Sequence, residues 1–166
     1  MPFDAYLWID GVKGESTSTG MKDKIDIISF SFGSSNPSTV SSGKGGMSAG
    51  KVHVSGFNVM KKMDAASNVL FAHNCTGDHF AKAEVILRKA GGKDSGQQVF
   101  LKYEFEFVMV DSIQWSGSSG GDDSPTESVQ FAFANFKTTY TKFDTMGKPA
   151  GNVGPVGWDL TKNAKM

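Results

Sequence analysis

One segment of the chain alternates apolar and polar residues for much longer than an ordinary strand does. In residues 98–115, QVFLKYEFEFVMVDSIQW, every second residue from Val99 to Met109 is apolar, and Lys102 and Glu104 lie between them. Successive side chains of a strand point to opposite faces, so the pattern predicts one apolar and one polar face. Typical strands have about 5–6 residues, whereas this segment would span roughly 60 Å if fully extended. The fold must therefore accommodate a strand that is longer than the core of a small protein.

Apolar runs elsewhere predict the partners of this strand. The other expected strands are residues 3–9, 25–33, 51–63, 81–89 and 126–143. In the last of them the apolar positions change parity between Phe133 and Phe136, which predicts a β-bulge near Ala134 and Asn135. Long, bent strands allow a sheet to curl and close on itself.

One helix is expected after residue 63. Asp64 is a good N-cap residue, and Gly77 can end the helix in the left-handed conformation. The expected apolar face consists of residues at helical spacing, namely Ala66, Val69, Leu70 and His73. The predicted fold class is mainly β, with an antiparallel β-barrel of two curled sheets, or a tight two-sheet sandwich, and one α-helix packed against it. The chain fits a single domain, 1–166, with Phe105 and Phe131 in its core.

The segment 34–50 is rich in Ser and Gly and has no periodicity. A loop of this length in a compact domain is usually functional or mobile, so we expect an unstructured functional loop.

Charge and composition disfavour several classes of partner. The 17 basic and 17 acidic residues cancel, so no basic excess attracts a nucleic acid or an anionic membrane. No window approaches the ~20 apolar residues of a membrane span. The start, MPFDAYLWID, lacks the features of a cleaved secretory signal, and Cys75 has no partner for an internal disulfide. We expect a chain that folds in the cytoplasm, or leaves it by a route that needs no cleaved signal.

Three motifs could carry chemistry, and each has a simpler interpretation. The segment 45–51, GGMSAGK, matches the core of a phosphate-binding loop, but Val52 stands where Ser or Thr should hold magnesium, and a strand is expected to follow. His73, Cys75, Asp78 and His79 are close in sequence, yet His73 and Cys75 point in different directions on a helix.

The third motif is the pair Glu104 and Glu106, which share a strand face as a glycosidase pair could. With Lys102 beside them they are more typical of a solvated face. We therefore predict no catalytic residue, no cofactor and no metal. Long strands, wide loops and neutral charge favour a β module that associates through its edges and loops.

Several short motifs occur together in a characteristic order. They are GVKGES (11–16), SFSFG (29–33), GKGGMSAGKVHV (43–54), CTGDHF (75–80), LRKAGGK (87–93), PTESVQFAF (125–133) and GW (157–158). In this order they resemble the haemolysin-coregulated protein (Hcp) family, the tube protein of bacterial type VI secretion, over nearly the whole chain. The sequence departs from commoner members at Phe30 and Phe32, where tryptophan often stands.

The resemblance implies a structural protein without enzymatic activity. It implies a homohexameric ring, rings that stack into a tube, a spike protein at the tube tip, sheath proteins that expel the tube, and effector cargo in the lumen. It also implies that the chain is cytoplasmic before firing and is then secreted through the apparatus without a signal peptide.

The resemblance also suggests two sites. Ser29 and Ser31 alternate with Phe30 and Phe32, so the serines should face away from the core, and the resemblance places this outward face in the lumen against cargo. The expected ring-stacking loop includes Asn36, Pro37, Lys44 and Met47. The alternative function is a stand-alone small β-barrel that binds a small ligand or acts as a hydrolase, which would usually be a monomer.

Overall fold

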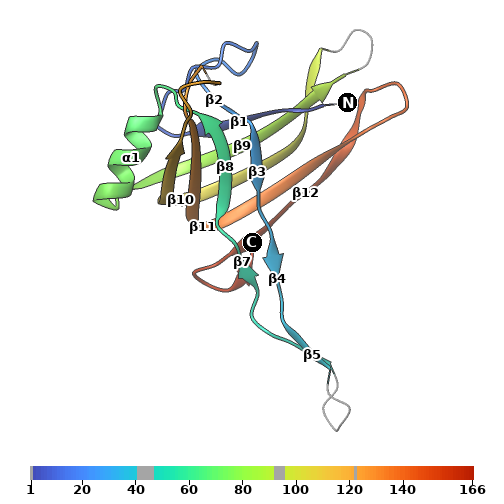
Figure 1. Cartoon of the computed structure of the whole chain (residues 1–166). Coiled ribbons are helices and arrows are strands. Elements are labelled where there is room, and N and C mark those ends of the chain that lie inside the picture. Colours follow the sequence, from blue (N-terminus) through green and yellow to red (C-terminus); the bar gives the residue numbers. More distant parts are fainter. Residues whose placement is uncertain (1, 41–46, 92–95, 122) are drawn as a thin grey trace.

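The computed structural model describes residues 2–40, 47–91, 96–121 and 123–166. Figure 1 shows the strands and the single helix found among these residues. The strands are β1 (Asp4–Ile9), β2 (Ile25–Ile27), β3 (Ser29–Ser31), β4 (Ser34–Ser35), β5 (Ser38–Val40), β6 (Met47–Ala49), β7 (His53–Val54), β8 (Phe57–Lys62), β9 (His79–Ala90), β10 (Gln97–Ser116), β11 (Thr126–Phe143), β12 (Pro149–Asp159) and β13 (Ala164–Lys165), and the helix is α1 (Ser67–Thr76).

The main sheet is antiparallel and has the order β13-β12-β11-β10-β9-β1-β2, with β8 added to β11 and β3 added to β8. The expected mainly β, antiparallel architecture with one helix is confirmed. The pairing path is not that of a closed barrel, because β2 and β3 stand at two of its ends and do not pair with each other. Helix α1 lies against β10, and within the described residues no helix is long and apolar enough to cross a membrane.

An aromatic cluster centred on Phe57 fills the core between β3, β8 and β10. The ring of Phe57 stacks on Phe30 at 5.6 Å between centroids, and it contacts Phe32 at 5.2 Å and Phe105 at 5.0 Å. Aromatic pairs at such distances add to the free energy of burial. Tyr103 lies in the same cluster, and its burial raises the pKa of the phenol above the ordinary value.

The long strand β10 does not keep its alternation, so part of the predicted apolar face is wrong. Phe107 has a left-handed φ of 55°, and neither ladder of β10 includes it. Because one residue in this conformation shifts the two-residue period, Phe105 and Val108 are both buried, whereas Phe107 is 52% exposed and Met109 also faces outward. The ring of Phe107 stacks on His79 instead.

The sequence predicted a β-bulge near Ala134 and Asn135 of β11, and the change of parity is present there, because Phe133 and Phe136 both pack against the core. The β10–β11 ladder lacks the pair that Phe107 would make with Ala134, and its register shifts between Val110 and Ser112. The side chain of Asn74 in α1 donates to the carbonyl oxygen of Val110 at 3.0 Å, so the helix is anchored beside this shift.

The helix begins later than expected. Ala66, and not Asp64, is the N-cap residue; the Asp64 carboxylate instead accepts from the Ala66 N–H in the preceding turn. The predicted C-terminus is confirmed, because Gly77 has a φ of 74° and its N–H donates to the His73 carbonyl. Leu70 is buried as predicted.

Two further helix residues depart from the expected face. Val69 is exposed although the spacing places it on the apolar face, and Ser67 is buried. Ser67 is buried because it belongs to a network of polar groups beneath the helix.

This network joins four elements through fully buried charges. The ammonium group of Lys61 in β8 makes ion pairs with Glu127 in β11 and with Asp64, and it donates to Ser67 Oγ at 3.1 Å. Glu127 also accepts from Ser67 Oγ at 2.8 Å and from Trp115 Nε1 at 2.9 Å. The side chains of Lys61 and Glu127 are 0% exposed, so each charge depends on the other for solvation.

The corrected face of β10 makes a testable prediction. Replacement of Phe105 or of Phe131 by Ala should lower the free energy of unfolding by ~3–5 kcal/mol, because each removes a buried ring and leaves a cavity. Phe107→Ala is the control on the same strand, and its cost should be under about 1 kcal/mol because the ring is half exposed. Denaturant unfolding measures all three variants. Equal costs at positions 105 and 107 would contradict the shifted alternation.

The buried network makes a second prediction. Lys61→Met should destabilise the fold by ~3–5 kcal/mol, because it leaves the Glu127 carboxylate buried and uncompensated. The double variant Lys61→Met with Glu127→Gln should recover part of this loss, since no fully buried charge then remains; Asp64 loses its ion pair but is 12% exposed. Denaturant unfolding measures the double variant and both single variants, Lys61→Met and Glu127→Gln. If the double variant lowers the free energy of unfolding by the sum of the two single losses, the two charges do not depend on each other.

Candidate assembly surface

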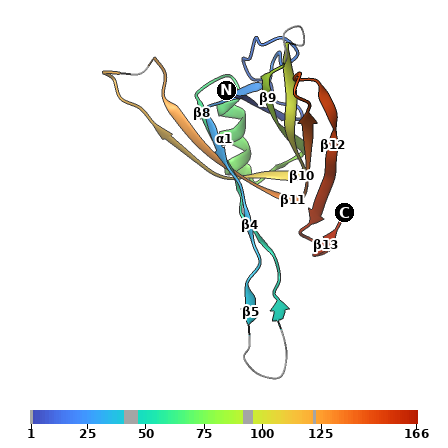
Figure 2. The same ribbon diagram turned by 90° about the vertical axis from the view of Figure 1, so that its right-hand side faces the viewer.

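Residues 34–40 and 47–54 form a two-stranded arm that projects away from the sheet (Figures 1 and 2). Strand β4 pairs with β7, and β5 pairs with β6 farther along the arm. Between the two ladders the N–H of Gly50 donates to the Pro37 carbonyl at 2.9 Å. At the base, Gly33 and Ser55 join the strands through the bond from Ser55 N–H to the Gly33 carbonyl. The expectation of an unstructured loop is wrong for the described part of this segment.

The arm forms because backbone groups pair with each other, although its small and polar side chains give no apolar periodicity. Gly50 is required by close approach: a Cβ at this position would lie 2.9 Å from the Pro37 carbonyl oxygen. Glycine at this position therefore reflects two closely approaching backbones.

The structure brings three of the four predicted stacking residues together on this arm. Asn36 and Pro37 lie between β4 and β5 and are exposed, and Met47 begins β6. Lys44 lies outside the described residues. The role of these residues in stacking stays a prediction.

The two predicted cargo residues lie on β3, next to the base of the arm. Ser29 and Ser31 are exposed, and Phe30 and Phe32 pack against the core, so the predicted alternation is confirmed. Strand pairing extends each serine into a row across the sheet. The first row is Ser31, Asn58, Gln130 and Ser112, and the second is Ser29, Met60, Ser128 and Gln114. These two rows, here called the uncharged face, contain no ionisable side chain.

The outer face of β9, β10 and β11 is different, because it is charged. Lys102 makes ion pairs with Glu84 at 3.2 Å and with Glu104 at 3.5 Å, and Glu104 is also the strand partner of Lys137. The Glu104 side chain thus belongs to a solvated ion-pair array.

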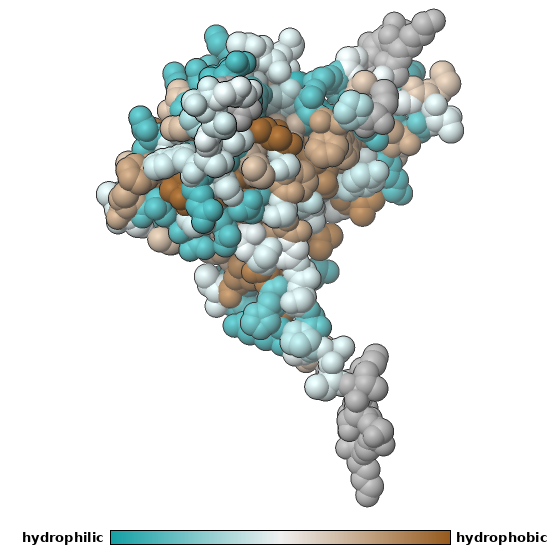
Figure 3. All heavy atoms as spheres, viewed as in Figure 1, coloured by the Kyte–Doolittle hydropathy of each residue, from teal (hydrophilic) through white to brown (hydrophobic). Residues whose placement is uncertain are grey.

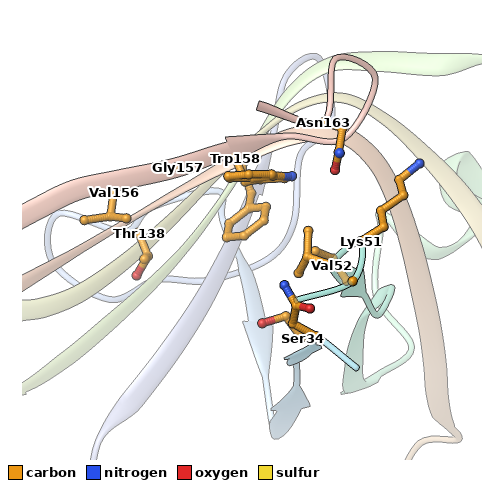
Figure 4. Close-up of a pocket in the computed structure, with 12 residues that line it drawn as sticks. Ser34, Lys51, Val52, Thr138, Val156, Gly157, Trp158 and Asn163 are labelled. Carbon is orange, nitrogen blue, oxygen red and sulfur yellow. The ribbon is translucent and has the colours of Figure 1, made fainter. Parts of the chain in front are cut away.

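A cavity of about 410 Å³ lies where the arm meets the strands β11 and β12 (Figure 4). It is lined by Ser34, Asn36, Gly50, Lys51, Val52, Val54, Phe136, Thr138, Val156, Gly157, Trp158 and Asn163. Val52 faces the indole of Trp158 across this cavity. The indole nitrogen of Trp158 is buried and has no hydrogen-bond partner among the described residues. The cavity thus combines apolar walls with one unused donor.

The histidines near the helix have structural contacts. His73 stacks on Phe80 at 4.1 Å, and His79 stacks on Phe107 at 3.9 Å. Cys75 is exposed. In the described ranges no group of three or more His, Cys, Asp or Glu side chains could hold a metal ion.

At the end of the chain, Asp159 and the turn that follows it hold the short strand β13 beside β12. The Asp159 carboxylate accepts from the hydroxyl of Thr161 at 2.6 Å and from the N–H groups of Thr161 and Lys162. The Thr161 hydroxyl, followed by the Lys162 N–H, lowers the pKa of this carboxyl below its ordinary value. These bonds fix the turn that carries Asn163 to the mouth of the cavity.

The arm, the uncharged face and the cavity offer backbone edges, small polar side chains and apolar space. Surfaces of these kinds are suited to association between protein chains, and the fold that carries them is a β module with one helix.

The comparisons with known proteins specify the family. The family model described as "Type VI secretion system effector, Hcp" matches residues 6–140. Protein hcp1 of Pseudomonas aeruginosa is 32% identical over 165 residues, which cover 99% of each chain. A solved structure of a type six secretion system protein has a TM-score of 0.92 at 36% identity, over 99% of this chain and 100% of that one. Hcp1 from Salmonella typhimurium has a TM-score of 0.79 at 30% identity, over 100% of both chains.

The chain belongs to the Hcp family of the type VI secretion system, and the resemblance found in its sequence is confirmed. It is a tube and effector protein of that system, and its family forms ring-like oligomers.

Proposed function

We propose that six copies of this chain form a ring, and that the rings stack into a tube that carries effectors in its lumen. A spike protein caps the tube and sheath proteins expel it. The chain waits in the cytoplasm before firing, is then secreted through the apparatus, and has no catalytic role. The observation that carries this proposal is the arm that projects beside the uncharged face. The arm offers a surface for contact between rings, and the uncharged face offers a separate surface for cargo.

The uncharged face is suited to a lumen. Its rows of Ser, Asn and Gln offer neutral hydrogen-bonding groups, and the Asp111 carboxylate beside them already accepts from Gln130 Nε2 at 3.1 Å. The charged face carries the ion pairs of Lys102 and is suited to solvent or to the sheath. We assign Ser29 and Ser31 to the cargo surface on this basis.

We also propose that the sheet closes into the barrel of the family. The chain passes from β2 to β3 at Ile28, whose N–H donates to the Met60 carbonyl at 2.7 Å in β8. Strand β2 pairs with β1 and strand β3 pairs with β8, so this bond lies at the point where the two ends of the sheet meet.

Ring formation and arm-dependent stacking can be measured together. Native mass spectrometry of the whole chain should give about six times 17.8 kDa, whereas a ligand-binding barrel would usually give a monomer. Residues 38–49 can be deleted and replaced by Asn-Gly, since Pro37 and Gly50 already form a closing hydrogen bond. This variant should keep the ring mass and lose stacking seen by electron microscopy.

Deletion of residues 118–121, in the connection between β10 and β11, is the control and should change neither property. A monomeric wild-type chain would contradict the proposed ring. Loss of the ring in the arm deletion would assign the arm to contacts between neighbours within one ring.

The cargo surface makes its own prediction. Ser31→Gln should keep the ring, because the side chain points away from the core, and should lower retention of an effector by crowding the contact. Ser119→Gln is the matched control, since Ser119 is exposed in the connection after β10. Co-purification of an effector with each ring, together with mass by light scattering, measures both effects. Equal retention by both variants would remove β3 from the cargo surface.

A further inference from the structure

The most exposed large apolar side chain among the described residues is Met146, at 72%. It lies at the tip of the turn that joins β11 to β12, and this turn points away from the arm (Figures 1 and 2). A single exposed apolar residue is ordinary on a protein surface. The way this one is held, and what lies at the opposite end of the same two strands, are the reasons to consider it further.

The turn that carries Met146 is fixed by its own hydrogen bonds. The Asp144 carboxylate accepts from the N–H groups of Met146 at 2.8 Å and Lys148 at 2.9 Å. The Asp144 N–H donates to the Lys148 carbonyl at 2.9 Å, and Gly147 provides the left-handed residue with a φ of 77°. The thioether is thus presented on an ordered tip, which reduces the entropy lost when it binds.

The cavity of about 410 Å³ lies at the other end of the β11–β12 ribbon. Phe136 and Trp158, which are strand partners there, form part of its wall, while Phe143 and Pro149 are partners next to the turn. The stretch of β12 from Pro149 to Trp158 spans about 30 Å at ~3.3 Å per residue. Met146 therefore cannot reach the cavity of its own chain, but it can reach that of a second copy placed end to end.

The tip and the cavity are chemically complementary. Methionine fills irregular apolar space and makes favourable contacts with aromatic rings, which Phe136 and Trp158 supply. A backbone carbonyl of the turn can accept from the buried indole N–H of Trp158, which has no partner in the described part of the chain. At the cavity mouth stands Lys51, for which the described residues provide no ion pair, and the incoming turn carries the carboxylate of Asp144.

We infer that the β11–β12 turn of one copy inserts Met146 into the cavity at the arm base of a copy in the next ring. The contact is head-to-tail, because the tip and the cavity are at opposite ends of one molecule, and such contacts propagate into an open stack. The inference rests on the proposed tube and adds a second contact between rings, at the base of the arm rather than along its length.

Disulfide trapping tests this contact directly. Met146→Cys and Val52→Cys are combined in a Cys75→Ser background, because Cys75 is exposed and could form links of its own. Oxidation should give a ladder of linked chains, in assemblies heavier than one ring, only when both new cysteines are present. Each single-cysteine variant is the control and should give linked dimers at most.

A charge placed on the tip tests the same contact without a link. Met146→Asp should weaken ring stacking at least tenfold, since a carboxylate is unfavourable in an apolar cavity. Met146→Leu should keep stacking, and Thr145→Asp adds the same charge beside the tip and should have a much smaller effect. Sedimentation measures the ring and the stack separately.

The outcomes separate this inference from the proposed function. Rings of six chains that link no further, or links confined to one ring, would overturn the Met146 contact and leave the ring intact. A monomeric wild-type chain would instead overturn the ring. Stacking that withstands Met146→Asp would also overturn the inference.

Discussion

The packing of Phe30 and Phe32 against Phe57 is the interaction on which the rest of the structure depends. These rings attach β3 to β8, and the arm leaves the chain directly after β3 and returns directly before β8. The same packing turns Ser29 and Ser31 outward. One aromatic cluster thus fixes the root of the arm, the start of the uncharged face and one side of the cavity at the arm base.

The buried network of Lys61 and Glu127 serves a different purpose from this cluster. The burial of aromatic rings is favourable in many orientations, whereas buried ion pairs with hydrogen bonds require closely defined geometry. The network links β8 and β11 to helix α1 and to Trp115 at the end of β10. It therefore holds in register the strands that carry the two rows of the uncharged face.

The sequence predicted those features that depend on local pattern. Alternation placed Ser31 outward and Phe105 inward, and Gly77 ended the helix as expected. The left-handed conformation of Phe107 leaves no trace in an alternating pattern, so the reversal after Phe105 was missed. The ordered set of short motifs indicated the family, because their order depends on the whole chain rather than on any single segment.

Features that join distant segments could not be predicted. Lys61 and Glu127 each stand at the inward-facing parity of their strands, two residues from Val59 and Val129. They are far apart in sequence, so nothing marks them as a pair. The cavity around Trp158 is assembled from the arm, β11, β12 and the turn after β12. The arm was missed for another reason: its strands are held by backbone groups, and periodicity reports only side-chain burial.

That last property of the arm has an evolutionary consequence. Gly50 must lack a side chain because of the Pro37 carbonyl, and the two ladders of the described arm are built from backbone pairing. Substitutions along it can change what the arm contacts while the ladder and the aromatic core beneath it remain as they are. Rings from related lineages can therefore diverge in mutual recognition without first losing a stable subunit.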